Sequence, residues 1–270
     1  FGSEGRDEQT FSTDQDNGIV FAPPEGASID ALKQRFLAYA LDVNKDLDRC
    51  GFPLCKGNIM ASNPQWCLTL DEWKDQFSTW IRIPQPDALL NATIFFDFRP
   101  LFGQAELADA MRRHLLAQTA VNPMFLRAMA KNALDVEPPL GKIRDFLTDL
   151  EPGHPGKIDL KKYGSRIFVD VARIYAMASG VHNTNTIQRL RISAQRLSIR
   201  SEEINAVLEG MNFIQLLRLQ HQYLEGEPGT QGDNLIDPET LNELDRRILK
   251  ESFRQARKIQ TRLKLDYQVQ

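Results

Sequence analysis

The chain has 270 residues, of which 42% are hydrophobic, enough for one large or two ordinary globular domains with cores of their own. Its formal net charge of -3 disfavours a surface that coats nucleic acid, and no apolar run approaches the roughly 18 residues of a membrane span. We therefore expect a cytoplasmic protein that contacts neither membrane nor nucleic acid.

The three cysteines, Cys50, Cys55 and Cys67, are an odd number in a long chain, which favours a reducing compartment over a disulfide framework. They lack a nearby histidine as fourth ligand, so a zinc site is disfavoured and incidental thiols are the default interpretation.

The first predicted strand is TDQDNGIVF, residues 13–21, which the turn-forming stretch APPEGAS closes. Side chains alternate between the two faces of a strand, so Asp14 and Asp16 should point the same way. Two carboxylates that close repel each other unless they share a positive partner. We expect that partner to be a divalent metal ion.

A helix should follow Ser28, because apolar residues recur at helical spacing as far as Leu47 and Gly51 stands where a left-handed C-terminal residue is expected. Residues 50–67 have no sustained period, and we expect a long, functional loop there. Thr69 and Glu72 have the spacing of a capping box before an amphipathic helix.

The next segment, ATIFFDFRP at residues 92–100, is rich in β-branched and aromatic residues and is expected to be a buried strand that carries Asp97. From Ala105 onward the pattern is almost entirely helical and predicts an antiparallel bundle. We expect helices that begin at Ala105, at Pro123 after the N-cap Asn122, near Phe168, at Thr186, at Ser201 and at Asp237-Pro238, with loops over 151–165 and 225–234.

A glycine-serine turn, Gly2-Ser3, precedes the paired aspartates, and Asp97 supplies a third carboxylate from a separate segment. Glycine allows backbone N–H groups to approach phosphate oxygens, and the serine hydroxyl adds a donor. Three carboxylates around two divalent ions suit phosphoryl or nucleotidyl transfer.

The stretch GSEGRDEQTFSTDQDN resembles the active-site motif of the DNA polymerase β-like nucleotidyltransferase superfamily. Nearly the whole chain is similar to the bacterial signal-transduction nucleotidyltransferase family, a similarity carried by CKGNIMASNPQW, IFFDFRPLFG, NTNTIQRL and DPETLNELDRRILKESFRQARKIQTRL. In that family a domain related to the PII uridylyltransferases precedes a helical substrate-binding domain. Cyclic-nucleotide-binding and CBS domains often lie upstream, which would explain why this chain begins abruptly at Phe1.

The resemblance implies an α+β fold. A small mixed-sheet nucleotidyltransferase core with helical insertions would occupy residues 1–136, its N-terminal strand truncated, and a helical substrate-binding bundle would occupy residues 137–270. It also implies that Asp14 and Asp16 bind Mg²⁺ or Mn²⁺, with Asp97 as third ligand or base. A nucleoside triphosphate (NTP) would be the donor, and Gly2, Ser3 and Arg6 would hold its phosphates.

Several of these residues have alternative interpretations. Asp97 could instead be a buried acid paired with Arg99, which the period-two spacing places on the same face. In the loop of residues 55–66, Lys56 and Asn58 could contact nucleotide, or the loop could be structural and pinned by Trp66.

Two basic segments also have two interpretations each. Lys161 and Arg166 could lie near a cleft between the domains, or on a solvated loop. The arginines and lysines of the last helix alternate with acids, which indicates a surface of ion pairs more than a nucleic-acid groove. None of the four histidines is followed by aspartate, so the chain lacks the His-Asp pair of metal-dependent phosphohydrolases.

The expected function is metal-dependent transfer of a nucleoside monophosphate to an acceptor hydroxyl, with release of pyrophosphate, in a signalling context. The acceptor could be a regulatory protein, by analogy with uridylyltransferases. The alternatives are a non-catalytic nucleotide-binding sensory module and, with less support, a protein-interaction module.

Overall fold

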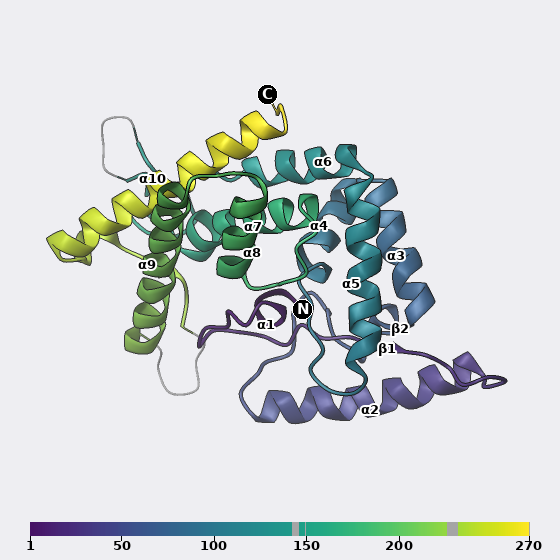
Figure 1. Cartoon of the computed structure of the whole chain (residues 1–270). Coiled ribbons are helices and arrows are strands. Elements are labelled where there is room, and N and C mark those ends of the chain that lie inside the picture. Colours follow the sequence, from purple (N-terminus) through teal and green to yellow (C-terminus); the bar gives the residue numbers. More distant parts are fainter. Residues whose placement is uncertain (142–145, 149, 226–231, 270) are drawn as a thin grey trace. The chain divides into compact units, whose positions relative to one another are not determined.

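The computed structural model describes residues 1–141, 146–148, 150–225 and 232–269, which form two compact units (Figure 1). The first unit comprises Phe1–Gln9 and Thr13–Asn122, and the second comprises Thr10–Ser12 and Pro123–Gln270. The boundary suggested by sequence, after residue 136, lies within the second unit, because helix α6, Pro123–Leu134, packs against helices of that unit.

The first unit surrounds a two-stranded parallel sheet. Strand β1 (Ile19–Phe21) pairs with β2 (Cys67–Thr69), so that Ile19 lies opposite Cys67 and Phe21 opposite Thr69. The other elements of the unit are α1 (Gly2–Gly5), α2 (Ile29–Arg49), the 3-10 turn η1 (Pro64–Trp66), α3 (Leu70–Arg82), α4 (Pro86–Phe95) and α5 (Ala105–Ala120). The α+β class is confirmed, although this described sheet is parallel and not mixed.

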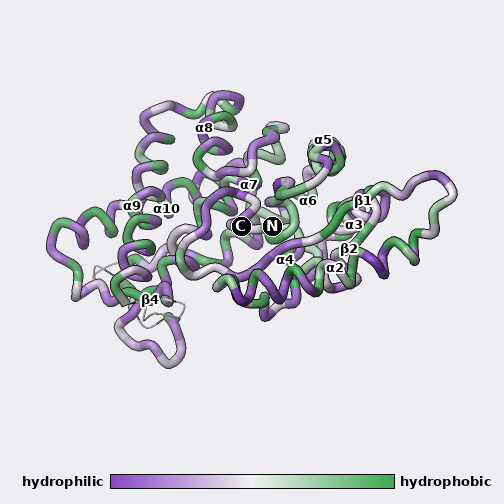
Figure 2. The backbone as a smooth tube through the Cα atoms, turned by 90° about the horizontal axis from the view of Figure 1, so that it is seen from below, coloured by the Kyte–Doolittle hydropathy of each residue, from purple (hydrophilic) through white to green (hydrophobic). Residues whose placement is uncertain are grey.

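The helix ends of the first unit follow the local sequence signals. Ser28 caps α2 by accepting a hydrogen bond from the Ala31 backbone N–H, and Gly51, just after that helix, has a φ of +95°. Thr69 and Glu72 form the predicted capping box at the start of α3. Figure 2 shows hydrophilic and hydrophobic residues alternating along α2, as expected for a helix with one face on the protein.

Aromatic side chains form the core of the first unit. The Trp66 and Phe95 ring centroids are 4.2 Å apart, and Phe77 meets Phe96 edge to face at 5.1 Å. The Trp73 indole N–H, fully enclosed in this core, donates to the carbonyl of Ile19 in β1 at 2.9 Å. The amphipathic helix predicted after Thr69 is confirmed as α3, which buries one face through Trp73, Phe77, Trp80 and Ile81.

The predicted strand over residues 92–100 is wrong. Helix α4 runs through Phe95, and residues 97–100 are irregular. Pro86 stands in the first turn of α4, where its missing N–H costs nothing. Ala88, Ala92 and Phe95 are then buried at spacings of four and three residues, so the segment uses a helical face that outweighs the β preference of its isoleucine and phenylalanines.

The second unit is a helical bundle built around α7 (Arg166–Ala178), in which every residue from Ile167 to Met177 is buried. Helices α6, α8 and α10 all pack against α7, and α9 packs along α10. The remaining elements are β3 (Ile158–Asp159), the π-helical turn η2 (Lys161–Ser165), α8 (Thr186–Arg196), α9 (Ser201–Glu225), β4 (Leu235–Ile236), the 3-10 turn η3 (Pro238–Thr240) and α10 (Glu243–Asp266). The predicted helical bundle is confirmed from Pro123 onward, whereas α5, which the sequence assigned to the same helical region, belongs to the first unit.

The structure corrects two details of the second unit. Asp237 and Pro238 begin the short turn η3, while the long helix α10 begins at Glu243 with Asn242 as its N-cap, because Leu241 between them is extended. The predicted loop over 151–165 contains β3, which pairs antiparallel with β4, and η2. Of the predicted loop over 225–234, residues 226–231 lie outside the described part of the chain.

Candidate functional site

The paired aspartates lie on one side of an extended segment. Strand β1 begins later than predicted, at Ile19, but Gln15 makes an isolated parallel bridge with Leu54. Gln15 is buried, with 4% of its surface exposed, whereas Asp14 and Asp16 are half-buried. The alternation expected of an extended chain therefore brings the two carboxylates together and directs Gln15 into the protein.

A third side chain, Cys55, joins the two carboxylates. One carboxylate oxygen each of Asp14 and Asp16 and the Cys55 sulfur all lie within 4.8 Å of one another. We call these three residues the Asp14-Asp16-Cys55 cluster. Sequence reasoning treated Cys55 as an incidental thiol, although it lies in the long loop that was expected to be functional.

The two segments that carry the cluster are joined by backbone hydrogen bonds. The Gln15 N–H donates to the Pro53 carbonyl at 3.1 Å, and the Asn17 N–H donates to the Ile59 carbonyl at 3.0 Å. Cys55 begins a tight turn in which the Asn58 N–H donates back to its carbonyl at 2.9 Å. The position of the thiol is therefore fixed by the backbone on both sides of it.

Buried amides stabilise the same arrangement from inside the first unit. The Gln15 side-chain NH₂ donates to the carbonyls of Asn44 and Phe52 at 2.8 and 2.7 Å, while the Asn44 side-chain NH₂ donates to the Gln15 side-chain oxygen at 2.8 Å. Asn44 is only 2% exposed. Helix α2 thus holds the segment that bears both aspartates.

The electrostatics of the cluster favour a protonated thiol. Burial, with a smaller contribution from a hydrogen bond to the Asp16 carboxylate, raises the pKa of the Cys55 thiol to about 11. In the absence of a cation, burial therefore favours the neutral thiol of Cys55.

The predicted phosphate-binding turn lies beside Asp16. A β-carbon placed on Gly2 would lie 3.4 Å from an Asp16 carboxylate oxygen, and Gly2 has a φ of +58°. The structure therefore brings Gly2 next to the cluster, with Ser3 following it in α1.

Arg6 binds Asp97, and both lie outside the cluster. Its guanidinium donates to the Asp97 carboxylate at 2.7 Å, and Asp97 is fully buried. Gly5 lies directly against this segment, since a β-carbon there would be 2.0 Å from the Asp97 carbonyl oxygen. The alternative that Asp97 is a buried, paired acid therefore has support, with Arg6 as the partner; Arg99, the partner suggested by sequence, is bound to Asp7 at 2.9 Å.

Trp66 holds the loop of residues 55–66 in place, which agrees with the structural interpretation of this loop. The Trp66 indole N–H and the Asn63 side-chain NH₂ both donate to the Asn58 carbonyl, at 3.1 and 3.0 Å. The side chains of Lys56 and Asn58 are exposed. Their contact with nucleotide stays a prediction.

Lys161 and Arg166 belong to the second unit. The Lys161 backbone N–H donates to the Asp159 carboxylate at 2.8 Å, and the Arg166 guanidinium donates to Asp170 at 3.3 Å. Both side chains are exposed, and their role in nucleotide binding stays a prediction.

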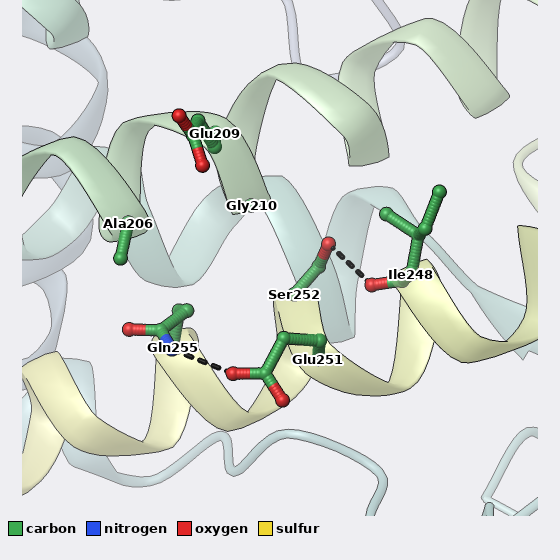
Figure 3. A pocket seen from close by; sticks show the side chains of 7 residues that line it. All are labelled: Ala206, Glu209, Gly210, Ile248, Glu251, Ser252 and Gln255. Atoms are coloured by element: carbon green, nitrogen blue, oxygen red, sulfur yellow. Dashed lines mark hydrogen bonds between the residues drawn. The ribbon is translucent and has the colours of Figure 1, made fainter.

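The second unit has a pocket of its own between α9 and α10 (Figure 3). Inside it the Ser252 hydroxyl donates to the Ile248 carbonyl at 2.8 Å, and the Gln255 side-chain NH₂ donates to Glu251 at 2.7 Å. Both bonds are made within α10, whereas the buried Gln255 side-chain oxygen has no hydrogen-bond partner among the described residues. Its lining residues are Ala206, Glu209, Gly210, Ile248, Glu251, Ser252 and Gln255, none of them a predicted site residue.

The arginines of α10 bind acids or carbonyl groups. Arg246 holds Glu239 at 2.7 Å, Arg254 holds Glu251 at 3.2 Å, and Arg257 donates to the Leu140 carbonyl at 2.8 Å. These contacts agree with the interpretation of the last helix as a surface of ion pairs. Among the described residues, no helix is both long and apolar enough to cross a bilayer.

The fold and the site define a two-unit α+β protein with a carboxylate-thiol cluster beside a glycine-serine turn. Residues 1–87 match the family model described as "Putative nucleotidyltransferase DUF294", and residues 123–267 match the model described as "Putative nucleotidyltransferase substrate binding domain". The chain belongs to this nucleotidyltransferase family, as its sequence motifs predicted. Asp97 lies beyond the end of the first match. No curated protein matches the chain.

Proposed function

We propose that this protein is a metal-dependent nucleotidyltransferase that moves a nucleoside monophosphate from an NTP to an acceptor hydroxyl and releases pyrophosphate. The observation that carries the proposal is the meeting of Asp14, Asp16 and the Gly2 turn at one place in the first unit of a member of this family.

The donor atoms of the cluster fit a divalent cation. Asp14 and Asp16 would hold Mg²⁺ or Mn²⁺, since both ions prefer carboxylate oxygens and the two side chains are open enough to accept water as further ligands. When bound, such an ion lowers the pKa of an attacking hydroxyl and neutralises charge on the triphosphate.

The residues around the cluster would bind and orient the donor. Gly2 lies beside Asp16 and Ser3 follows it in α1. In this proposal the backbone at Gly2 and the Ser3 hydroxyl donate hydrogen bonds to phosphate oxygens. Lys56 and Asn58 follow Cys55 directly and would add a cation and an amide from the opposite segment.

The acceptor is the least defined part of the reaction. By analogy with uridylyltransferases we propose that the acceptor is the side chain of a regulatory protein in a bacterial signalling pathway. The free thiols and the NTP donor favour a reducing, cytoplasmic setting.

One observation favours the alternative of a non-catalytic nucleotide-binding module. Asp97, the expected third ligand or base, is fully buried and bound by Arg6. Before it could accept a proton from the acceptor, its carboxylate would have to leave this ion pair. A protein that only senses nucleotide has no need of that step.

The test combines each of the four NTPs with Mg²⁺ or Mn²⁺ and records pyrophosphate release together with the melting temperature. The double variant Asp14→Asn, Asp16→Asn removes both proposed ligands, while Asp42→Asn, Asp48→Asn makes the same charge change on exposed residues of α2. We expect the unaltered protein and the Asp42→Asn, Asp48→Asn variant to release pyrophosphate, and the Asp14→Asn, Asp16→Asn variant to release none.

Stabilisation by nucleotide without release would support the sensory module instead. Neither release nor stabilisation with any NTP would contradict both functions and leave the protein-interaction module.

A further inference from the structure

The Asp14-Asp16-Cys55 cluster contains a side chain, Cys55, that nucleotidyl transfer does not require. Carboxylate oxygens suffice for Mg²⁺, which demands near-octahedral oxygen coordination and keeps several waters. The Cys55 sulfur nevertheless lies within 4.8 Å of both proposed carboxylate ligands. A sulfur at this place changes which ions the cluster can hold.

The spacing of the three ligand atoms is compatible with a tetrahedral ion, and the sulfur is the ligand that distinguishes such an ion from Mg²⁺. A tetrahedral zinc-type ion binds oxygen at about 2.0–2.2 Å and thiolate sulfur at about 2.3 Å, so that its ligand atoms lie about 3.3–3.8 Å apart. The three ligand atoms already lie within 4.8 Å of one another, so side-chain rotation alone can close the remaining distance.

The backbone makes this convergence a property of the fold. Asp14 and Asp16 flank Gln15, whose backbone N–H donates to the Pro53 carbonyl. Leu54, the residue after Pro53, forms the parallel bridge with Gln15. Cys55 is the following residue. The two ligand-bearing segments are therefore in register, and the thiol is presented to the aspartates wherever the first unit is folded.

We infer that Cys55 is a third ligand of the proposed cation site and makes it a site for thiophilic divalent ions such as Zn²⁺ and Cd²⁺, bound by Asp14, Asp16 and Cys55. Soft thiolate ligands select such ions over Mg²⁺ and Mn²⁺. The inference rests on the proposed function only in taking Asp14 and Asp16 as cation ligands. It implies that Zn²⁺ competes with the ion that serves nucleotidyl transfer.

Binding exchanges one proton for one metal-sulfur bond. As the Cys55 sulfur coordinates, its S–H bond breaks, the proton passes to solvent, and the metal-sulfur bond forms. No oxidation or reduction takes place.

The experiment titrates the whole chain with Cd²⁺ alone, without nucleotide, and follows the ultraviolet ligand-to-metal charge-transfer band that a Cd²⁺-thiolate bond produces. We expect one ion per chain with the band. Cys55→Ser should abolish the band and weaken Cd²⁺ binding by roughly tenfold or more. Asp16→Asn should weaken Cd²⁺ binding, but the charge-transfer band should still appear at a higher Cd²⁺ concentration, because the thiol is unchanged.

The matched control is Cys50→Ser, since Cys50 is the other cysteine outside the core, whereas Cys67 is fully buried. It should leave the band unchanged. A measurement on the unaltered protein removes any doubt about folding of the variants: Cd²⁺ should protect Cys55, but not Cys50, from iodoacetamide, as read by mass spectrometry of the two peptides.

Absence of the band in the unaltered protein would overturn the inference, as would a band that persists in Cys55→Ser or protection of Cys50 in place of Cys55. Failure of the proposed function gives a different result. A protein that binds Cd²⁺ through Cys55 but releases no pyrophosphate with any NTP contradicts the transferase and leaves the thiophilic site standing.

Discussion

At the scale of single residues, two arginines of the first unit bind carboxylates in environments that differ in exposure. The Arg6 side chain is 12% exposed and holds a carboxylate, Asp97, that is fully buried. The Arg99 side chain is 32% exposed, and its partner Asp7 is 65% exposed. Water screens the second pair but cannot solvate Asp97, so the two arginines should contribute very differently to stability.

We predict that Arg6→Met destabilises the first unit by about 3 kcal/mol or more, because it removes the guanidinium that binds two carboxylates, Asp97 and Glu8, which are 0% and 7% exposed. Arg99→Met should cost less than about 1 kcal/mol. Urea denaturation followed by tryptophan fluorescence measures both, and adding Asp97→Asn to Arg6→Met should recover part of the loss. Equal losses in the two single variants would contradict the importance of burial here.

The candidate site could be predicted from sequence only where its residues are close together in the chain. Asp14 and Asp16 share a side because alternate residues of an extended segment do so, which is a local property. Arg6 and Asp97 are 91 residues apart, and their pairing depends on the close packing of Gly5 against the Asp97 backbone. Cys55 reaches the cluster through the bridge between Gln15 and Leu54, which no local pattern reveals.

At the scale of elements, the strongest local signals were helix ends. The capping box of α3 is reciprocal: the Glu72 N–H donates to the Thr69 hydroxyl at 3.2 Å, and the Thr69 N–H donates to the Glu72 carboxylate at 2.8 Å. Glu72 also accepts a hydrogen bond from Lys33 of α2 at 2.6 Å. One glutamate therefore fixes the start of α3 and ties it to α2.

The pH dependence of Glu72 follows from these bonds. Burial by itself raises its pKa, but hydrogen bonds from Lys33 and Thr69 outweigh burial and hold the pKa below the ordinary value of 4.5. A carboxyl whose pKa is lower in the folded state stabilises the protein above its ordinary pKa, and this contribution is lost as the pH falls through the lowered value.

We predict that Thr69→Val, which removes the hydroxyl but keeps the shape, destabilises the first unit by about 1 kcal/mol. Glu72→Gln keeps a side chain that can complete the box and removes only the charge. Its destabilisation should be largest at neutral pH and should shrink as the pH falls below 4.5, measured by urea denaturation at a series of pH values. A cost that does not change with pH would show that the bond with Lys33 contributes nothing through charge.

Helix α4, which the sequence pattern wrongly predicted as a strand, has no capping box of this kind. No side chain caps its N-terminus, and its residues Thr93, Ile94 and Phe95 each favour strands when taken alone. The helix forms because Ala92 and Phe95 pack in the aromatic core beside Trp66 and Trp80. Tertiary packing outweighed local propensity, and the local sequence pattern does not reveal which partners a segment packs against.

At the scale of the whole molecule, the two units have separate cores and separate optical reporters. All three tryptophans, Trp66, Trp73 and Trp80, belong to the first unit, as do the proposed cation ligands. The most buried helix of the second unit, α7, packs against α6, α8 and α10 of the same unit. A cation that binds the first unit should therefore stabilise that unit without requiring any change in α7.

We predict that Mn²⁺ at about 100 times its dissociation constant stabilises the first unit by about 2.7 kcal/mol, which slows the slowest amide exchange of α3 about 100-fold. Exchange in α7 should not change, because neither proposed ligand belongs to its unit. Hydrogen exchange resolved by mass spectrometry measures both helices in one sample, and Asp14→Asn with Asp16→Asn should abolish the effect in α3. Equal slowing in α3 and α7 would show that the chain unfolds as one cooperative body, and slowing in α7 alone would place the cation in the second unit.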